Sequence, residues 1–193
     1  MRRLAIPLAA LVVVAIIVIG LTQTGGQKSG PDKLTLSEMR QDLQGAPPQL
    51  AALYRRANTV VGGSTKAFQR QLADLKGHPV VVNKWASWCG PCRQEFPIFQ
   101  HVATKLGKQV AFMGINANDH DTAARNFLRN EALPYPSFSD GNLAISGKLG
   151  IVPIFPTTVF FDAKGKRQYI HQGYYTSTAQ LTADIRRYAI GAS

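Results

Sequence analysis

The sequence predicts an α/β domain in which a mixed sheet is flanked by helices. Two short, continuous apolar runs, at residues 80–83 and 110–116, indicate buried strands. Segments with helical spacing follow both runs, and turn residues at 163–166 separate two further strands of an antiparallel hairpin. Strand, helix, strand, helix, hairpin and helix in this order are typical of a mixed sheet covered by helices.

An apolar segment stands at the start of the chain. Residues 4–21 are uncharged and rich in Val and Ile, and at about 1.5 Å per residue they can cross the hydrocarbon layer of a bilayer. Arg2 and Arg3 precede them, which places the N-terminus in the cytoplasm and the rest of the chain outside. We therefore expect a single-pass transmembrane anchor over residues 1–21. A cleaved secretory signal is the alternative, although no Ala-x-Ala site is present.

Two segments separate this anchor from the predicted domain. Residues 22–33 are rich in Gly, Gln, Ser and Thr, which predicts a flexible linker. Residues 34–76 predict a small helical extension that carries no recognisable chemistry. We expect it to pack against the domain, and a face that docks a partner is the alternative. Its three expected helices span 37–43, run from Pro48 toward Gly62, and run from an N-cap at Thr65 toward Leu75.

The domain itself is expected over residues 77–193, which is long enough for one compact core. The helix after the first strand should reach about Leu106, with a kink at Pro97. The remaining expected elements are a helix capped by Asp121, an extended piece at 136–140, a short helix capped by Asn142, hairpin strands at 157–162 and 167–173, and a last helix capped by Ser177.

The only two cysteines, Cys89 and Cys92, lie at the turn from the first strand to this helix. Pro91 falls in the first helical turn, where a missing N–H costs nothing. The unpaired N–H groups and the positive end of the helix dipole favour a thiolate at Cys89. Cys92, one turn further on, should be more buried and placed to attack a mixed disulfide formed at Cys89. The spacing therefore predicts a redox-active dithiol.

Other interpretations of the cysteine pair are weaker. A structural disulfide across two residues removes little chain entropy, and a structural zinc site needs about four ligands. Cu(I) binding by the two cysteines and one histidine is a further alternative. The histidines are scattered along the chain, at His78, His101, His120 and His171. We expect no metal and no cofactor other than the Cys89–Cys92 disulfide.

The string Asn-Lys-Trp-Ala-Ser-Trp-Cys-Gly-Pro-Cys-Arg-Gln-Glu-Phe-Pro, at 83–97, resembles the active site of the thioredoxin superfamily. It is similar to the membrane-anchored TlpA/ResA branch, and the resemblance covers roughly residues 77–190. It implies a thioredoxin-like fold and an extracytoplasmic thiol–disulfide oxidoreductase, acting as a reductant of exported protein disulfides, including those of cytochrome c biogenesis. A membrane thiol electron carrier is the implied donor. An oxidant in exported-protein folding and an anchored interaction domain are the alternatives.

The resemblance also implies residues that bind the substrate. Pro156 matches a cis-proline that faces the two cysteines and leaves the backbone of Phe155 free to pair with an extended peptide. An ordinary trans proline is the alternative. Trp88, Gly90 and Pro91 belong to the same substrate-binding group. Trp85 and Trp88 are expected to shield the dithiol, with simple core or surface packing as the alternative.

Three polar residues around the dithiol distinguish this sequence. Asn83 stands where ordinary thioredoxin has a buried Asp, so this position cannot titrate. Glu95 matches an acidic residue that ResA-like proteins place beside the dithiol, where it can raise the pKa of Cys92 and relay its proton. A solvated glutamate is the alternative. Lys84 occupies a position that is usually apolar and must find solvent or a partner.

The net charge is +11, and +9 remains without Arg2 and Arg3. A domain this basic is drawn to anionic lipid or to acidic partners. The dispersed charges and the predicted export argue against a nucleic-acid partner.

Overall fold

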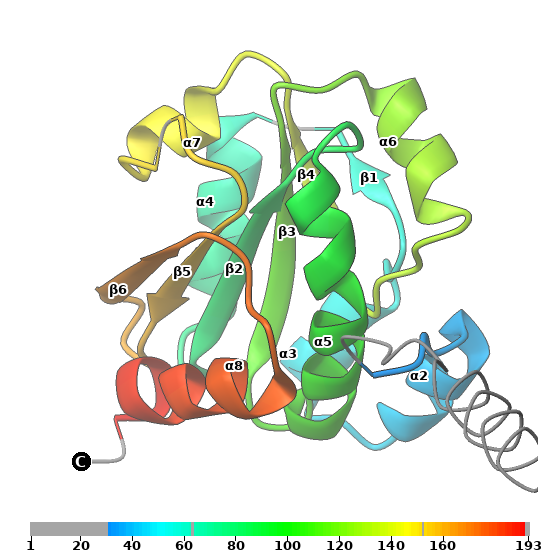
Figure 1. Ribbon diagram of the computed structural model, residues 1–193. Helices are drawn as coiled ribbons and strands as arrows, with labels where there is room; N and C mark the ends of the chain where they lie inside the picture. The colour runs from blue at the N-terminus through cyan, green and yellow to red at the C-terminus, as the bar shows by residue number, and fades with distance from the viewer. Residues whose placement is uncertain (1–30, 63, 152, 192–193) are drawn as a thin grey trace, which may run out of the picture.

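The computed structural model describes residues 31–62, 64–151 and 153–191 (Figure 1). The predicted anchor and most of the predicted linker lie outside these residues, so both stay predictions. Within the described ranges, no helix combines the length and the apolar character needed to cross a bilayer.

The described chain forms one six-stranded sheet with the strand order β1-β4-β3-β2-β5-β6. The first four strands of this order pair in parallel, and β5 and β6 join antiparallel, so the predicted mixed sheet and its hairpin are confirmed. The strands are β1 (Val60–Val61), β2 (Val80–Trp85), β3 (Ala111–Ala117), β4 (Ser137–Asp140), β5 (Thr157–Phe161) and β6 (Arg167–Gln172).

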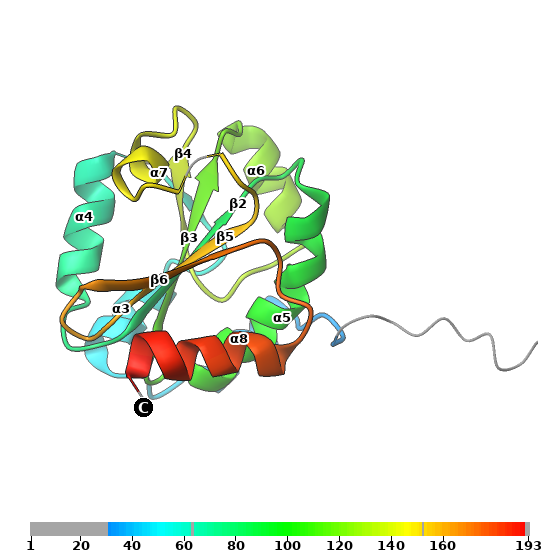
Figure 2. The ribbon, with the colours of Figure 1, turned by 60° about the vertical axis from the view of Figure 1, so that its left-hand side comes forward.

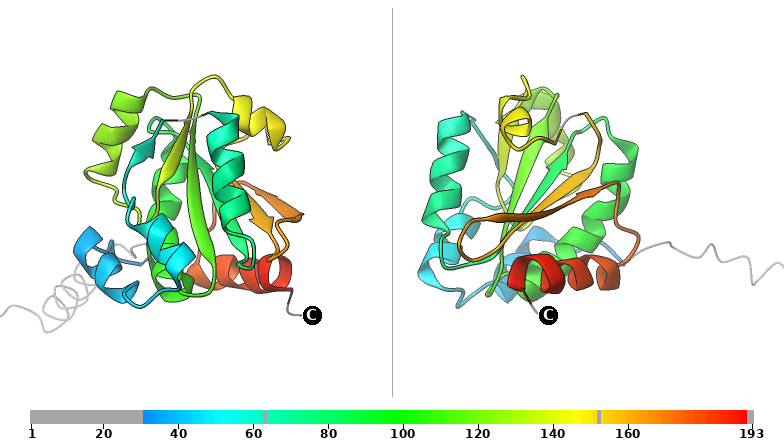
Figure 3. Two further views of the ribbon diagram at one scale, coloured as in Figure 1. Left: turned by 180° about the vertical axis from the view of Figure 1, so that it is seen from behind. Right: turned by 90° about the vertical axis from the view of Figure 1, so that its left-hand side faces the viewer.

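Helices cover both faces of the sheet, as the edge-on view in Figure 2 shows. Helices α4 and α7 lie on one face, and α5, α6 and α8 lie on the other (Figure 3). The helices are α2 (Leu36–Asp42), α3 (Pro48–Tyr54), α4 (Thr65–Asp74), α5 (Gly90–Leu106), α6 (Asp121–Leu128), α7 (Ala144–Lys148) and α8 (Thr178–Asp184), which continues as the π-helix η1 (Ile185–Ile190).

Strand β1 was not predicted. The helix expected to run toward Gly62 ends at Tyr54, and Asn58, with a φ of 61°, redirects the chain into Val60 and Val61. These two residues pair with β4, which lies far along the sequence. Segment 34–76 therefore supplies the edge strand of the sheet as well as three helices. Tyr54 also binds the core, because its hydroxyl donates to the Val110 carbonyl at 2.9 Å.

Three predicted helix caps were wrong. Ser64, not Thr65, caps α4, and its hydroxyl accepts the Ala67 N–H at 3.1 Å. Asp121 is the first residue of α6 rather than its cap. At α7 the cap position is Leu143 rather than Asn142, although the Asn142 side chain still accepts the first helical N–H, that of Ala144, at 3.3 Å. The buried carboxylate of Asp140 accepts the next two, those of Ile145 and Ser146. The predicted cap at Ser177 is confirmed.

Candidate redox site

The two cysteines form a disulfide at the start of α5, with their Cα atoms 5.3 Å apart. Cys89 is the N-cap residue, and its sulfur accepts the Cys92 N–H at 3.1 Å. Gly90 and Pro91 open the helix as predicted. Cys89 retains 4% of its surface and Cys92 none, so attack from solvent is directed to Cys89. The helix N-terminus stabilises negative charge on the sulfur that is exposed.

The turn that carries Cys89 is held by the connection between β3 and α6. Asp119 accepts hydrogen bonds from the Ser87 N–H at 2.6 Å and from the Ser87 hydroxyl at 2.9 Å. The indole N–H of Trp88 donates to the Asn118 carbonyl at 2.9 Å. We did not predict these contacts. The polar residues at 118–120, just after the carboxyl end of β3, could have indicated them, because the loops that follow neighbouring parallel strands meet at the same edge of the sheet.

An exposed apolar surface lies beside the disulfide. The Phe155–Pro156 bond is cis, as predicted. The ring of Phe155 lies 5.0 Å from that of Trp88, centroid to centroid. Trp88 is 56% exposed and Ile154, which we did not predict, is 43% exposed. Trp88 therefore presents a large apolar surface next to Cys89, whereas Trp85 is fully buried and packs on Phe96 and Phe127 in the core.

The backbone of Phe155 is free to pair with another strand. No described residue forms a hydrogen bond with its N–H or its carbonyl, whereas the flanking Ile154 and Pro156 carbonyls are both occupied. An extended peptide can pair at such an edge.

Glu95 is fully buried, which excludes the alternative of a solvated glutamate on the helix surface. Its Oε1 accepts the Asn83 amide N–H at 2.7 Å, and its Oε2 accepts the backbone N–H of Tyr175 at 3.1 Å. Burial raises the pKa of Glu95 to about 8, and these two hydrogen bonds oppose the rise. At neutral pH the carboxyl is therefore largely protonated. Glu95 lies one helical turn after Cys92, with about 5–6 Å expected between their Cβ atoms.

Tyr175 is a residue of the site that we did not predict. Besides its N–H on Glu95, its hydroxyl donates to Asp184 at 2.8 Å, and its ring stacks on His171 at 4.1 Å. It belongs to the β6–α8 connection, and no local pattern marks it.

Lys84 lies on the opposite face of β2 and is also fully buried. Its ammonium donates to the Ile151 carbonyl and lies 4.1 Å from the centroid of the Phe155 ring. Burial lowers the pKa of Lys84 to about 8, against the attraction of Asp140. Lys84 thus binds the segment that leads to Pro156. The partners that a buried lysine requires are the Ile151 carbonyl and the Phe155 ring.

The described residues bring no three His, Cys, Asp or Glu side chains together in a group that could hold a metal ion. The site consists of a disulfide, a buried carboxyl and an apolar rim.

The sequence matches the family described as redoxin over residues 61–185. The thiol-disulfide oxidoreductase ResA of Bacillus thuringiensis (strain Al Hakam) is 35% identical over 97 residues, which are 50% of this chain and 56% of that protein. The thiol:disulfide interchange protein DsbE of Pseudomonas fluorescens biotype C is 42% identical over 96 residues, which are 48% and 51% of the two chains. The chain thus spans about half the length of the curated relatives it matches.

Solved structures resemble the fold. A DsbF homologue from Corynebacterium diphtheriae is 33% identical, with a TM-score of 0.55 over 60% of this chain and 75% of that one. A secreted Mycobacterium tuberculosis disulfide oxidoreductase homologous to E. coli DsbE is 26% identical, with a TM-score of 0.54 over 60% and 85%. These neighbours share the thioredoxin-like arrangement of sheet and helices.

Proposed function

Because the chain belongs to the redoxin family, we propose that it is a thiol–disulfide oxidoreductase that reduces disulfides of exported proteins from the outer side of the cytoplasmic membrane. One observation carries the proposal: the Cys89–Cys92 disulfide stands at a helix N-terminus, with only Cys89 reaching the surface. The names of the relatives, ResA and DsbE, support the same chemistry.

The reaction proceeds in two exchanges. In the reduced protein, the Cys89 thiolate attacks a substrate disulfide, which forms a mixed disulfide and releases one substrate thiolate. The Cys92 thiolate then attacks the Cys89 sulfur and releases the second substrate thiolate. The protein is left with the Cys89–Cys92 disulfide, and two electrons from a membrane thiol carrier restore the dithiol.

The ionised form of Glu95, which a pKa of about 8 leaves at roughly a tenth of the molecules at pH 7, is the proposed proton acceptor for Cys92. A buried thiol must lose its proton before it can attack, and a free cysteine has a pKa near 8.5. The Glu95 pKa of about 8 lies close to that value, so the proton can pass with little change in free energy. An ordinary solvated carboxylate, with a pKa of about 4.3, would accept it far less well.

The substrate is proposed to be an extended peptide with an apolar side chain near its cysteine. The free backbone groups of Phe155 support pairing with a strand, and Trp88 and Ile154 offer apolar surface beside Cys89. Gly90 and Pro91, at the first turn, complete the proposed contact surface. Cytochrome c biogenesis is a proposed setting, because its substrates present paired cysteines in an unfolded chain.

The test is a trapping experiment with the full chain. The Cys92→Ser variant should accumulate a mixed disulfide with an unfolded exported substrate that carries a disulfide, and Cys89→Ser should trap none. The equilibrium potential of the wild-type dithiol against glutathione gives the direction. A value near that of thioredoxin, about −270 mV, supports a reductant, whereas one near about −120 mV assigns an oxidant. Trapping at Cys92 would reverse the two roles.

A further inference from the structure

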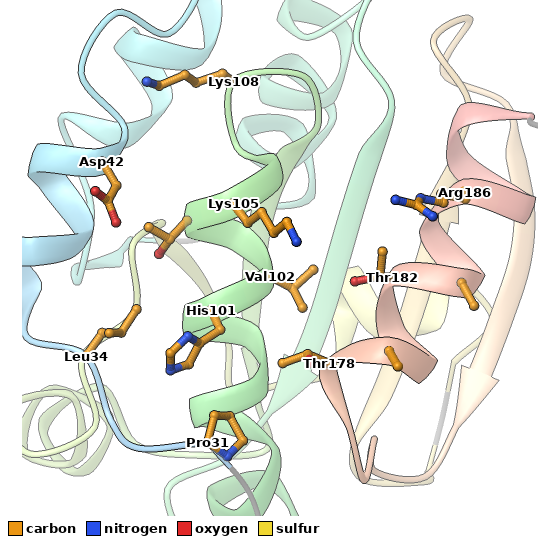
Figure 4. A pocket seen from close by; sticks show the side chains of 13 residues that line it. Pro31, Leu34, Asp42, His101, Val102, Lys105, Lys108, Thr178, Thr182 and Arg186 are labelled. Carbon is orange, nitrogen blue, oxygen red and sulfur yellow. The ribbon is translucent and has the colours of Figure 1, made fainter.

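A groove of about 950 Å³ lies along the second half of α5, between α2 and α8 (Figure 4). It is separate from the redox site. Lys105 stands 16 residues after Cys89, which at about 1.5 Å per residue puts it about 24 Å further along the helix axis. In Figure 1 the start of α5 lies at the upper end of the molecule, and α8 lies at the lower end.

The groove is lined by unpaired positive charge. Lys105, Lys108 and Arg186 line it, and none of them forms an ion pair with a described residue. Figure 4 shows Lys105 and Arg186 pointing into the space between α5 and α8, with the Thr182 side chain nearby. Asp42, on α2, is the one carboxylate in the lining. Lys105 and Arg186 face a common space, and cations placed in this way are suited to a negatively charged partner.

The chain enters the described structure at this groove. Pro31, the first described residue, is part of the lining. The segment after it is held in place: the Asp32 carbonyl contacts the His101 ring nitrogen at 2.8 Å, and the Leu34 N–H donates to Gln100 at 3.0 Å. Lys33 forms an ion pair with Glu131 at 2.6 Å. The exit point of residues 1–30 is therefore fixed beside the basic side chains.

This exit point limits how far the groove can lie from the membrane. Residues 22–30 separate Pro31 from the end of the predicted anchor, and nine extended residues span at most about 32 Å. Such a tether keeps the groove at a high effective concentration near the lipid surface, so weak contacts suffice to orient the domain. The surface charge of anionic lipid attracts Lys and Arg within about a Debye length.

We propose that this basic groove is a docking surface for anionic phospholipid headgroups, and that it turns the α2–α8 side of the domain toward the membrane. The proposal rests on the membrane anchoring under the proposed function. In the docked orientation the dithiol end of α5 points away from the bilayer, toward exported substrates.

The test uses the full chain in lipid nanodiscs that carry a nitroxide on a fraction of the headgroups. One set contains phosphatidylcholine alone, and the other contains equal parts of phosphatidylcholine and phosphatidylglycerol. Paramagnetic broadening of backbone amide signals reports which face approaches the lipid. We expect selective broadening of residues 105–108 and 182–186 with phosphatidylglycerol, and its loss at high salt.

A pair of triple variants separates local contact from net charge. Lys105→Gln/Lys108→Gln/Arg186→Gln should abolish the selective broadening, because each basic residue contributes about fivefold near an anionic surface and three contribute about a hundredfold. The matched control removes the same charge from the opposite face of the sheet, through Lys66→Gln, Arg70→Gln and Lys76→Gln, and should keep the pattern. Neither triple variant should alter the redox potential.

Three outcomes overturn the proposal: no preference for these residues, equal loss in both triple variants, or displacement by inorganic phosphate that exceeds displacement by chloride at equal ionic strength. The last would assign a free-anion site instead of a lipid surface. Absence of the chain from the nanodiscs is a different result, because it contradicts the anchor. The trapping experiment with the dithiol variants does not depend on any of these results, so it tests the proposed function separately.

Discussion

Asn83 and Lys84 are neighbours on β2, but their side chains serve opposite faces of the sheet. On the α5 face, Asn83 binds the buried carboxyl of Glu95. On the other face, Lys84 binds the Ile151 carbonyl beneath the ring of Phe155. Glu95 and Lys84 both have a pKa of about 8. Burial raises the pKa of the Glu95 carboxyl to this value and lowers the pKa of the Lys84 ammonium to it.

Burial acts on an acid and a base in opposite directions, because it makes the neutral form of each more accessible. The sheet lies between the two groups, so they do not form an ion pair. Glu95 adjoins Cys92 and is therefore suited to proton transfer. Lys84 adjoins the segment before Pro156 and is therefore suited to hold the substrate-binding rim.

The two faces also make opposite contributions to the dependence of stability on pH. The folded-state pKa of Glu95 is raised from the ordinary value of 4.5. The stability that Glu95 contributes is therefore fully present below pH 4.5 and is lost as the pH rises through about 8. The folded-state pKa of Lys84 is lowered from 10.5 to about 8. The stability that Lys84 contributes is therefore fully present above pH 10.5 and is lost as the pH falls through about 8.

The largest expected effect is on the Glu95 face. Glu95→Gln keeps a neutral hydrogen-bonding group but cannot titrate. The free energy of unfolding of wild type minus that of the variant should fall by on the order of 4 kcal/mol between pH 4.5 and 8. Urea unfolding of the oxidised proteins across this range measures it. The exposed Glu38→Gln is the control and should give no such fall. A flat difference for Glu95→Gln would mean that the carboxyl is ionised when folded.

The Lys84 face should show a smaller effect of the opposite sign. For Lys84→Met, the same difference in unfolding free energy should rise by about 2.5 kcal/mol between pH 8 and 10.5, as the wild-type ammonium loses its proton. The exposed Lys66→Met serves as the control. If wild type and Lys84→Met kept parallel profiles up to pH 10.5, the ammonium would titrate as though it were in water.

The smallest effect concerns the thiol. With Cys89→Ser as background, so that Cys92 is the thiol that titrates, Glu95→Gln should lower the pKa of Cys92 by about one unit, because an ionised carboxylate opposes a second negative charge. Ultraviolet absorbance of the thiolate against pH follows the titration. In the same background, Lys84→Met should leave the curve in place. Superimposable curves with and without the Glu95→Gln substitution would remove Glu95 from the catalytic residues.

Much of this site follows from local sequence. A cysteine pair spaced by two residues, after a β-branched run and before a helical pattern, specifies a dithiol at a helix N-terminus, because the strand, the turn and the first helical turn are all encoded within a few residues of Cys89. The hairpin strands and the final helix with its cap at Ser177 are local in the same sense. The redox chemistry and the mixed sheet could therefore be predicted.

The remaining features depend on contacts between distant parts of the chain. Val60 and Val61 became a strand because β4, more than 70 residues later, offers a free edge. Glu95 is bound by Tyr175 across 80 residues, and Lys84 by Ile151 across 67. Only tertiary packing removes water from these two side chains, and the loss of hydration is what moves both pKa values. The sequence by itself thus determined where the sulfur chemistry lies, and the folded structure decided the protonation of the groups around it.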